Sequence, residues 1–109
     1  MPALKENPTL KNYQKYVEEL VRERGFADVN VQELFMLLIE EVGEMAKAAR
    51  KAAGMHIDRR SEEKNLAHEM ADVLIYLFDI ANRFKVDLEQ AFREKEEQNE
   101  QRHWEKKHK

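Results

Sequence analysis

Hydrophobic residues recur every three or four positions along most of this chain, which is the spacing of one face of an α-helix. The first hydrophobic stripe runs from Leu10 to Val21. Thr9 stands before it as a suitable N-cap, and Gly25 follows it as a suitable helix stop. The pattern therefore predicts a first helix that ends at about Arg24.

Three further helices are expected from the same periodicity. Each begins after a residue whose side chain can accept a hydrogen bond from a free backbone N–H of the first turn. No stretch shows the alternation of a half-buried strand. The expected class is therefore all-α, as a four-helix, antiparallel bundle-like subunit completed by oligomerisation. The three expected spans are 30–53, 61–84 and from 87 onward, capped by Asn30, Ser61 and Asp87.

Composition agrees with a helical protein and narrows its class. The 109 residues fit a single domain 1–109, with 1–8 as a loose lead-in and 103–109 as a basic tail that frays. The counts Gly 3 and Pro 2 leave few turns, and Cys 0 removes disulfides and thiolate chemistry. A net charge of -3 argues against binding nucleic acid. No membrane-spanning run or signal peptide is recognisable, so a cytoplasmic protein is expected.

Two acidic pairs lie beside the hydrophobic faces of the second and third expected helices. In the apolar stretch 37–45, Glu41 and Glu44 are three residues apart. In the stretch 66–74, Glu69 and Asp72 repeat that spacing. Residues three apart share one flank of a helix, and a carboxylate buried without a partner costs several kcal/mol. Both pairs therefore need an explanation.

The two acidic pairs can face each other if their helices pack antiparallel. Four carboxylates in one place would repel one another unless a cation lay between them. A ligand set of oxygen atoms alone suits a hard cation, Mg²⁺ or Mn²⁺. The alternative stays open that the acids lie on solvated faces, where glutamates at this spacing are common.

The fourth helix changes character along one face. That face is apolar over residues 88–92 and continues as Lys95, Asn99 and Arg102, which we call the Lys/Asn/Arg line. Lysine and arginine are the usual partners of phosphate groups. A solvated surface helix is the competing interpretation.

These stretches resemble the all-α nucleoside triphosphate pyrophosphohydrolases of the MazG type. The family pattern is EExxE, followed after a gap by ExxD. It corresponds here to Glu40-Glu41-x-x-Glu44 and Glu69-x-x-Asp72. The similarity extends into the Lys/Asn/Arg line and spans about 34–102, whereas the first helix matches only in general character.

The resemblance implies hydrolysis of a nucleoside triphosphate to the monophosphate and pyrophosphate, with Mg²⁺ as cofactor and Mn²⁺ as a substitute. It implies that Glu40 orients or deprotonates the attacking water, and that the Lys/Asn/Arg line lies near the phosphate and sugar of the substrate. It also implies a homodimer or a dimer of dimers. The implied metal ligands are Glu41, Glu44, Glu69 and Asp72.

Three rival interpretations remain. Phosphoribosyl-ATP pyrophosphatases share the metal acids, so the acidic motif alone does not separate them from the favoured family. A di-iron bundle would need two Glu-x-x-His motifs, and this chain has that spacing once, at Glu100 and His103. A non-catalytic adaptor bundle would explain the amphipathic helices, but it would not explain acids beside both central stripes.

Overall fold

The computed structural model describes residues 2–55 and 65–102, and within these ranges it contains helices and no strand. The expected all-α class is confirmed for this part of the chain. None of the helices in these ranges is long and apolar enough to cross a membrane. The helices are α1 (Leu10–Glu23), α2 (Val31–Ala52), α3 (Leu66–Arg83) and α4 (Leu88–Glu100).

The helix starts follow from side chains that cap the first turn. Thr9 and Asn12 form a capping box, in which each side-chain oxygen accepts from the other residue's backbone N–H, at 2.9 and 3.1 Å. Asn30 caps α2 and Asp87 caps α4, as predicted. The ends of α1 and α2 are followed by Gly25 and Gly54, whose positive φ angles of 78° and 77° close the last turn without a Cβ clash.

The third helix begins later than the sequence predicted. Asn65 is its N-cap, and its side-chain oxygen accepts from the backbone N–H of His68 at 3.1 Å. The predicted cap, Ser61, lies outside the described residues. The later start agrees with the hydrophobic pattern, because the apolar stripe begins directly after Asn65.

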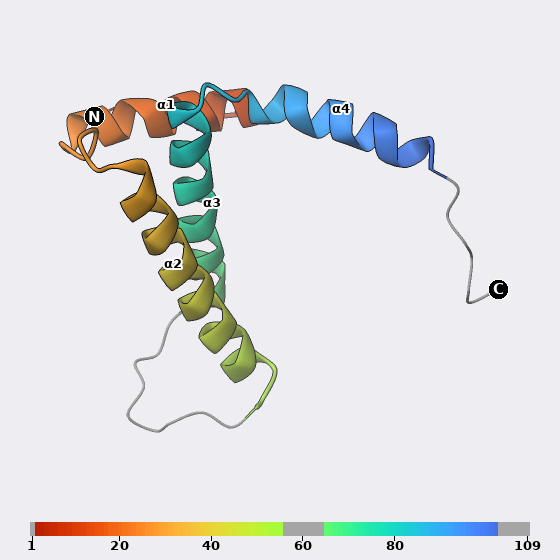
Figure 1. Ribbon diagram of the computed structural model, residues 1–109. Coiled ribbons are helices and arrows are strands. Elements are labelled where there is room, and N and C mark those ends of the chain that lie inside the picture. The colour runs from red at the N-terminus through yellow and green to blue at the C-terminus, as the bar shows by residue number, and fades with distance from the viewer. Residues whose placement is uncertain (1, 56–64, 103–109) are drawn as a thin grey trace.

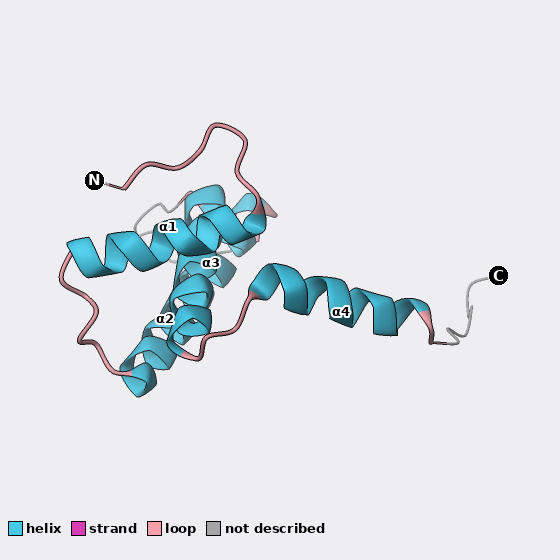
Figure 2. Ribbon diagram, turned by 90° about the horizontal axis from the view of Figure 1, so that it is seen from above, coloured by secondary structure: helices cyan, strands magenta, loops and turns pink. Residues whose placement is uncertain are grey.

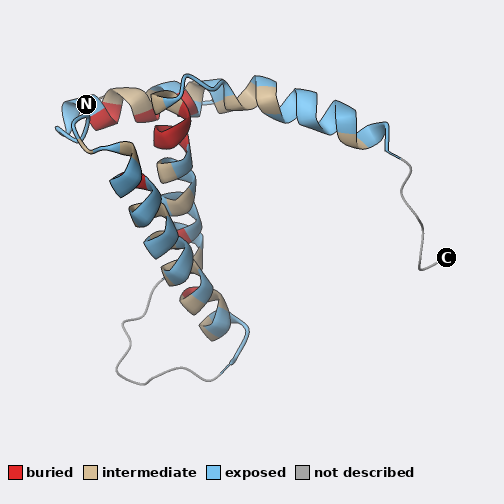
Figure 3. Ribbon diagram, in the orientation of Figure 1, coloured by how far each residue is buried: buried red, intermediate tan, exposed pale blue. Residues whose placement is uncertain are grey.

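The helices α2 and α3 lie side by side and antiparallel, and α1 crosses their upper end (Figures 1 and 2). The buried residues gather where α1 meets the end of α3 (Figure 3). There, Val17, Leu20 and Val21 of α1 pack against Phe78 of α3, which is only 1% exposed. This junction fixes the orientation of α3 and hence of the acids at its other end.

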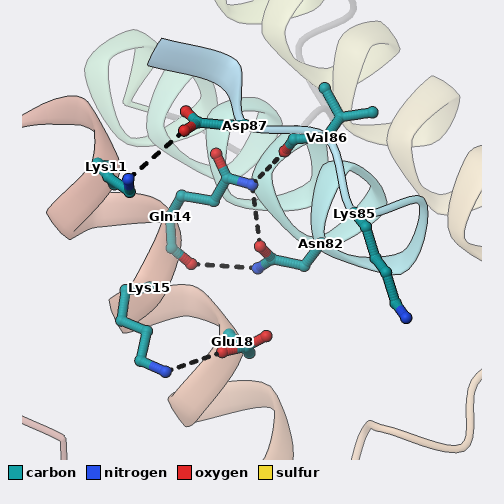
Figure 4. Close-up of a pocket in the computed structure, with 8 residues that line it drawn as sticks. All are labelled: Lys11, Gln14, Lys15, Glu18, Asn82, Lys85, Val86 and Asp87. Carbon is teal, nitrogen blue, oxygen red and sulfur yellow. Dashed lines mark hydrogen bonds and ion pairs between the residues drawn. The ribbon is translucent and has the colours of Figure 1, made fainter. Parts of the chain in front are cut away.

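A polar junction ties α1 to the connector before α4 (Figure 4). The Gln14 amide nitrogen donates to the Asn82 side-chain oxygen at 3.0 Å and to the Val86 carbonyl at 2.6 Å. Asn82 donates in return to the Gln14 carbonyl at 3.1 Å, and the Leu88 backbone N–H donates to the Gln14 side-chain oxygen at 3.1 Å. The buried side-chain amide of Gln14 therefore forms hydrogen bonds with α3 and with the connector that leads into α4, and it helps to fix the position at which α4 begins.

The fourth helix packs mainly on α1 and then extends away from α2 and α3 (Figure 1). None of its residues is buried, and Phe92 is 68% exposed. Large apolar side chains also remain exposed along the α2–α3 pair, which we call the open apolar face. On α2 they are Phe35, Met36, Ile39 and Val42, and on α3 they are Met70, Leu74, Ile75 and Leu77.

Candidate functional site

Acids from the two antiparallel helices converge in the structure. One carboxylate oxygen each from Glu41, Glu69 and Asp72 lies within 4.8 Å of the other two. We call these three residues the acid cluster. Glu41 lies in the middle of α2 and the other two lie in the first turns of α3, so the antiparallel pairing of the helices brings them together. The facing of acids that the spacing predicted is therefore present.

The acid cluster extends from the core to the solvent. Glu69 is buried, Glu41 is half-buried and Asp72 is exposed. Burial raises the pKa of Glu41 above its ordinary value, and so do a hydrogen bond to the Glu69 carboxyl and the negative charges of Asp72, Glu69 and Glu44. Glu41 therefore holds its proton more tightly than an isolated glutamic acid does.

Two further predicted acids lie at the border of the cluster. The charge of Glu44 reaches Glu41, but its oxygens are not part of the three-residue group. Glu40 is exposed, and its negative charge contributes to the raised pKa of the Tyr76 phenol. Their predicted roles, as a fourth metal ligand and as the residue that orients water, stay predictions.

The donor set of the cluster fits a hard divalent cation. All three groups supply carboxylate oxygens, which Mg²⁺ and Mn²⁺ prefer. Within residues 2–55 and 65–102, no lysine or arginine forms an ion pair with any of the three acids. A buried carboxylate such as Glu69 ordinarily has a cationic partner, and a metal ion would supply one.

A cavity of about 310 Å³ adjoins the acid cluster. Asp72, Tyr76 and Asp79 of α3 line one side of it, and Phe26 and Leu37 are among the apolar residues that line the rest. Burial raises the pKa of Tyr76 above 10, and nearby acids, Glu41 foremost, raise it further. The phenol therefore stays protonated and can donate a hydrogen bond. We call this space the Tyr76 cavity.

Asp79 lines this cavity, although it was not among the site residues that the sequence predicted. Asp79 follows Asp72 by two helical turns, so the shared helix face was a signal that could have identified it. Its Oδ1 atom accepts from Arg83 Nε at 3.2 Å, and Arg83 also donates to the carbonyls of Val29 and Phe26. Burial raises the pKa of Asp79, while the ion pair with Arg83 opposes that rise.

The structure does not bring the Lys/Asn/Arg line to the acid cluster within one chain. Lys95, Asn99 and Arg102 belong to α4 and the residues just after it, and α4 extends away from α2 and α3 (Figure 1). Lys95 and Arg102 are exposed, and Asn99 is half-buried. The predicted contact with phosphate and sugar stays a prediction. His103, of the di-iron alternative, lies outside the described residues.

The sequence is similar to known proteins over most of its length. The family model described as the MazG nucleotide pyrophosphohydrolase domain matches residues 30–106. The chain is 34% identical over 101 residues to dCTP pyrophosphatase 1 of Mus musculus, a match that covers 88% of this chain and 59% of that protein. It is 33% identical over 89 residues to dCTP pyrophosphatase 1 of Bos taurus, covering 77% and 53%. The chain thus spans little more than half the length of these relatives.

Proposed function

Because the chain belongs to the MazG nucleotide pyrophosphohydrolase domain family, we propose that it hydrolyses a nucleoside or deoxynucleoside triphosphate to the monophosphate and pyrophosphate. The observation that carries this proposal is the convergence of Glu41, Glu69 and Asp72 from two antiparallel helices. The relatives are named dCTP pyrophosphatases, so dCTP is the first substrate to test.

Mg²⁺ is the cofactor that this site favours, and Mn²⁺ would substitute. The acid cluster would hold it, and Glu44 would join the ligands after a change of side-chain rotamer. When bound, the ion would neutralise the polyphosphate and polarise the scissile phosphorus.

Glu40 is the residue of this chain that we assign to the attacking water. It precedes the cluster residue Glu41, and its carboxylate is exposed to solvent. An exposed carboxylate can accept a hydrogen bond from water and orient it, and it can take up a proton as the oxygen attacks. The protonated Tyr76 phenol is suited to donate to an oxygen of the substrate.

A second copy of the chain would complete the site. The open apolar face gathers large exposed apolar side chains on two paired helices, and exposed apolar surface of this kind often marks protein–protein contacts. We propose that it is covered in a homodimer, or in a dimer of dimers. In such an assembly, α4 of one copy would bring its Lys/Asn/Arg line to the acid cluster of the other. The cytoplasmic location stays a prediction.

The test of the activity is a panel of canonical nucleoside and deoxynucleoside triphosphates, with phosphoribosyl-ATP included, assayed with Mg²⁺ and with EDTA. We expect pyrophosphate as the first product from at least one triphosphate, and no product in EDTA. Hydrolysis of phosphoribosyl-ATP alone would favour that rival enzyme class. Inactivity on the whole panel would favour the adaptor bundle, and orthophosphate as the first product would refute the proposed bond cleavage.

The composite site has its own test, in which Glu69→Gln and Lys95→Ala are expressed separately and together. Glu69→Gln alone should be nearly inactive, and Lys95→Ala alone should lose about 10-fold or more in kcat/KM. Co-expressed copies should regain partial activity, because each hybrid dimer would hold one site with intact acids and an intact lysine. Failure of the mixed protein to regain activity, although it is dimeric, would show that α4 does not reach the partner's site.

A further inference from the structure

The Tyr76 cavity combines a mostly apolar lining with one buried carboxylate and the side chain of Arg24. Asp79 is 6% exposed, and it lines the cavity together with apolar residues such as Leu34 and Phe26. The volume of about 310 Å³ is at the small end of the range for small-molecule sites, which are mostly apolar with a few placed polar groups. The shape and lining therefore suit one flat, partly polar ring.

The ion pair with Arg83 engages only one of the two carboxylate oxygens of Asp79. Arg83 Nε donates to Oδ1, and Oδ2 has no hydrogen-bond partner among the described residues. In those residues no fully buried polar side-chain atom lacks a partner, so Oδ2 is not sealed inside the protein. Arg83 lines a smaller depression of about 120 Å³ and does not line the Tyr76 cavity. Asp79 therefore borders both spaces, whereas its partner Arg83 borders only the smaller of these two.

The position of Asp79 relative to the acid cluster matches the dimensions of a nucleoside. Asp72 belongs to the cluster and also lines the cavity, and Asp79 lies two turns further along α3. Seven residues of helix rise by about 10 Å. That separation is comparable with the span of a nucleoside from its 5′ oxygen to the far edge of its base. A triphosphate bound at the acid cluster can therefore place its base next to Asp79.

We infer that Asp79 is a specificity-determining residue, which selects nucleotides whose base carries an exocyclic amino group by accepting a hydrogen bond from that group. The inference rests on the proposed function. An amino group at C4 of cytosine is a donor, whereas uracil and thymine carry a carbonyl acceptor there. A carbonyl facing Oδ2 would leave two acceptors opposed and the carboxylate unsatisfied in an apolar site, which is the arrangement that discriminates most strongly.

The test compares dCTP with dUTP, which have the same sugar and phosphates. Their kcat/KM ratio is measured for the wild type and for Asp79→Asn. Asparagine keeps an oxygen for Arg83 and turns its amide NH₂ into a donor for the uracil carbonyl. We expect the dCTP/dUTP ratio to fall by about 10- to 100-fold in the variant, with dUTP gaining relative to dCTP. Dissociation constants of the two α,β-imido analogues should shift in the same direction.

Two control variants separate base selection from a structural role. Arg83→Met removes the ion pair and leaves the carboxylate in the cavity, so it should lower stability while the wild-type ratio is retained. Glu18→Gln removes a carboxylate that borders only the smaller depression and the α1–α4 junction, and it should change neither quantity. If Asp79 serves only to hold Arg83, both Asp79→Asn and Arg83→Met will lower activity on the two substrates equally.

A measurement on the wild type covers the case in which Asp79→Asn does not fold. The deoxynucleoside triphosphate of 2-pyrimidinone has hydrogen in place of the amino group, and kcat/KM for it should be about 10- to 100-fold below that for dCTP. Equal rates on dCTP and this analogue, or an unchanged dCTP/dUTP ratio in Asp79→Asn, would overturn the inference and leave the proposed hydrolase intact. Inactivity on every triphosphate would overturn the proposed function, and the inference with it.

Discussion

Replacing Glu69 with glutamine should stabilise the metal-free protein. Glu69 is 7% exposed, and one of its oxygens lies within 4.8 Å of oxygens of Glu41 and Asp72. Without a metal, three carboxylates repel one another there at pH 8. Glutamine keeps nearly the same shape and removes one of the three charges. The prediction concerns the free energy of unfolding, measured by thermal and urea melts after EDTA treatment.

The magnitude follows from the distance between the charges. At 4.8 Å, two unit charges repel by about 0.9 kcal/mol at the dielectric constant of water and by about 3.5 kcal/mol at an effective value of 20. The pair with exposed Asp72 belongs near the first value, and the pair with half-buried Glu41 lies between the two. Solvent and salt screen the repulsion at the exposed end of the cluster and reduce these values. The expected net gain is at least about 1 kcal/mol, or a rise in Tm of at least about 4 °C.

The gain should depend on pH with a definite sign. The pKa of Glu41 is raised in the folded protein above its value of 4.5, so the folded state binds more protons than the unfolded state just above that pH. The cluster therefore lowers the stability of the folded wild type as pH rises through the folded pKa. The advantage of Glu69→Gln should be largest at pH 8 and should shrink as the pH falls toward 4.5.

The assay uses six melting curves. The wild type, Glu69→Gln and Glu97→Gln are each melted with and without Mg²⁺, and Glu97→Gln is the control for loss of an exposed acid on α4. Mg²⁺ at a hundredfold excess over its dissociation constant should stabilise the wild type by about 2.7 kcal/mol, because it binds only the folded state. The Glu69 variant should lose most of that gain, and the control should retain it. Equal Mg²⁺ responses in wild type and Glu69→Gln would refute the metal site.

Four further substitutions test other parts of the structure. Lys95→Ala and Arg102→Ala should each lower kcat/KM by about 10-fold or more, since charge-assisted contacts to phosphate are lost. The rise in melting temperature that Mg²⁺ produces should stay the same in both variants. Unfolding of either variant would show that the residue is structural. Arg83→Met should destabilise the fold by about 3 kcal/mol in urea melts, because Asp79 keeps a buried charge without its partner; a loss below about 1 kcal/mol would show that the pair contributes little. Gln14→Leu should cost about 2 kcal/mol in the same assay, as it leaves buried polar groups of the α4 connector unsatisfied; a neutral effect would show that water replaces the amide.

Local patterns were sufficient to predict most helix boundaries and the meeting of the acids. Thr9, Asn30 and Asp87 cap their helices as expected, because a cap depends only on the residue and on the turn that follows it. Glu41 and Glu69 meet because each lies beside an apolar stripe, and the two stripes can pack together only when the helices lie side by side. Here the tertiary arrangement follows from two local periodicities.

The environment of Asp79 could not be predicted in the same way. Its partner Arg83 is one turn away, which the sequence reveals, but Arg83 is held by backbone carbonyls of Phe26 and Val29 in a connector more than 50 residues earlier. Carbonyl groups carry no residue-specific signal, and their position depends on how α1 crosses α3. For the same reason, the burial of Gln14 by Val86 and Leu88 has no signature in the hydrophobic pattern.

One face of α3 links the site to the stability of the fold. Asp72, Tyr76 and Asp79 lie along it at spacings of four and three, and the first and last are the acids that reach the metal and the base in our proposals. Phe78, on the adjoining face, is the most buried side chain of the α1–α3 core. The hydrophobic core and the proposed site share the rigid helix α3, so the distance between Asp72 and Asp79 is fixed. A nucleotide that contacts both acids must match that distance. Substitutions in the α1–α3 core that tilt α3 should therefore lower activity before they unfold the protein.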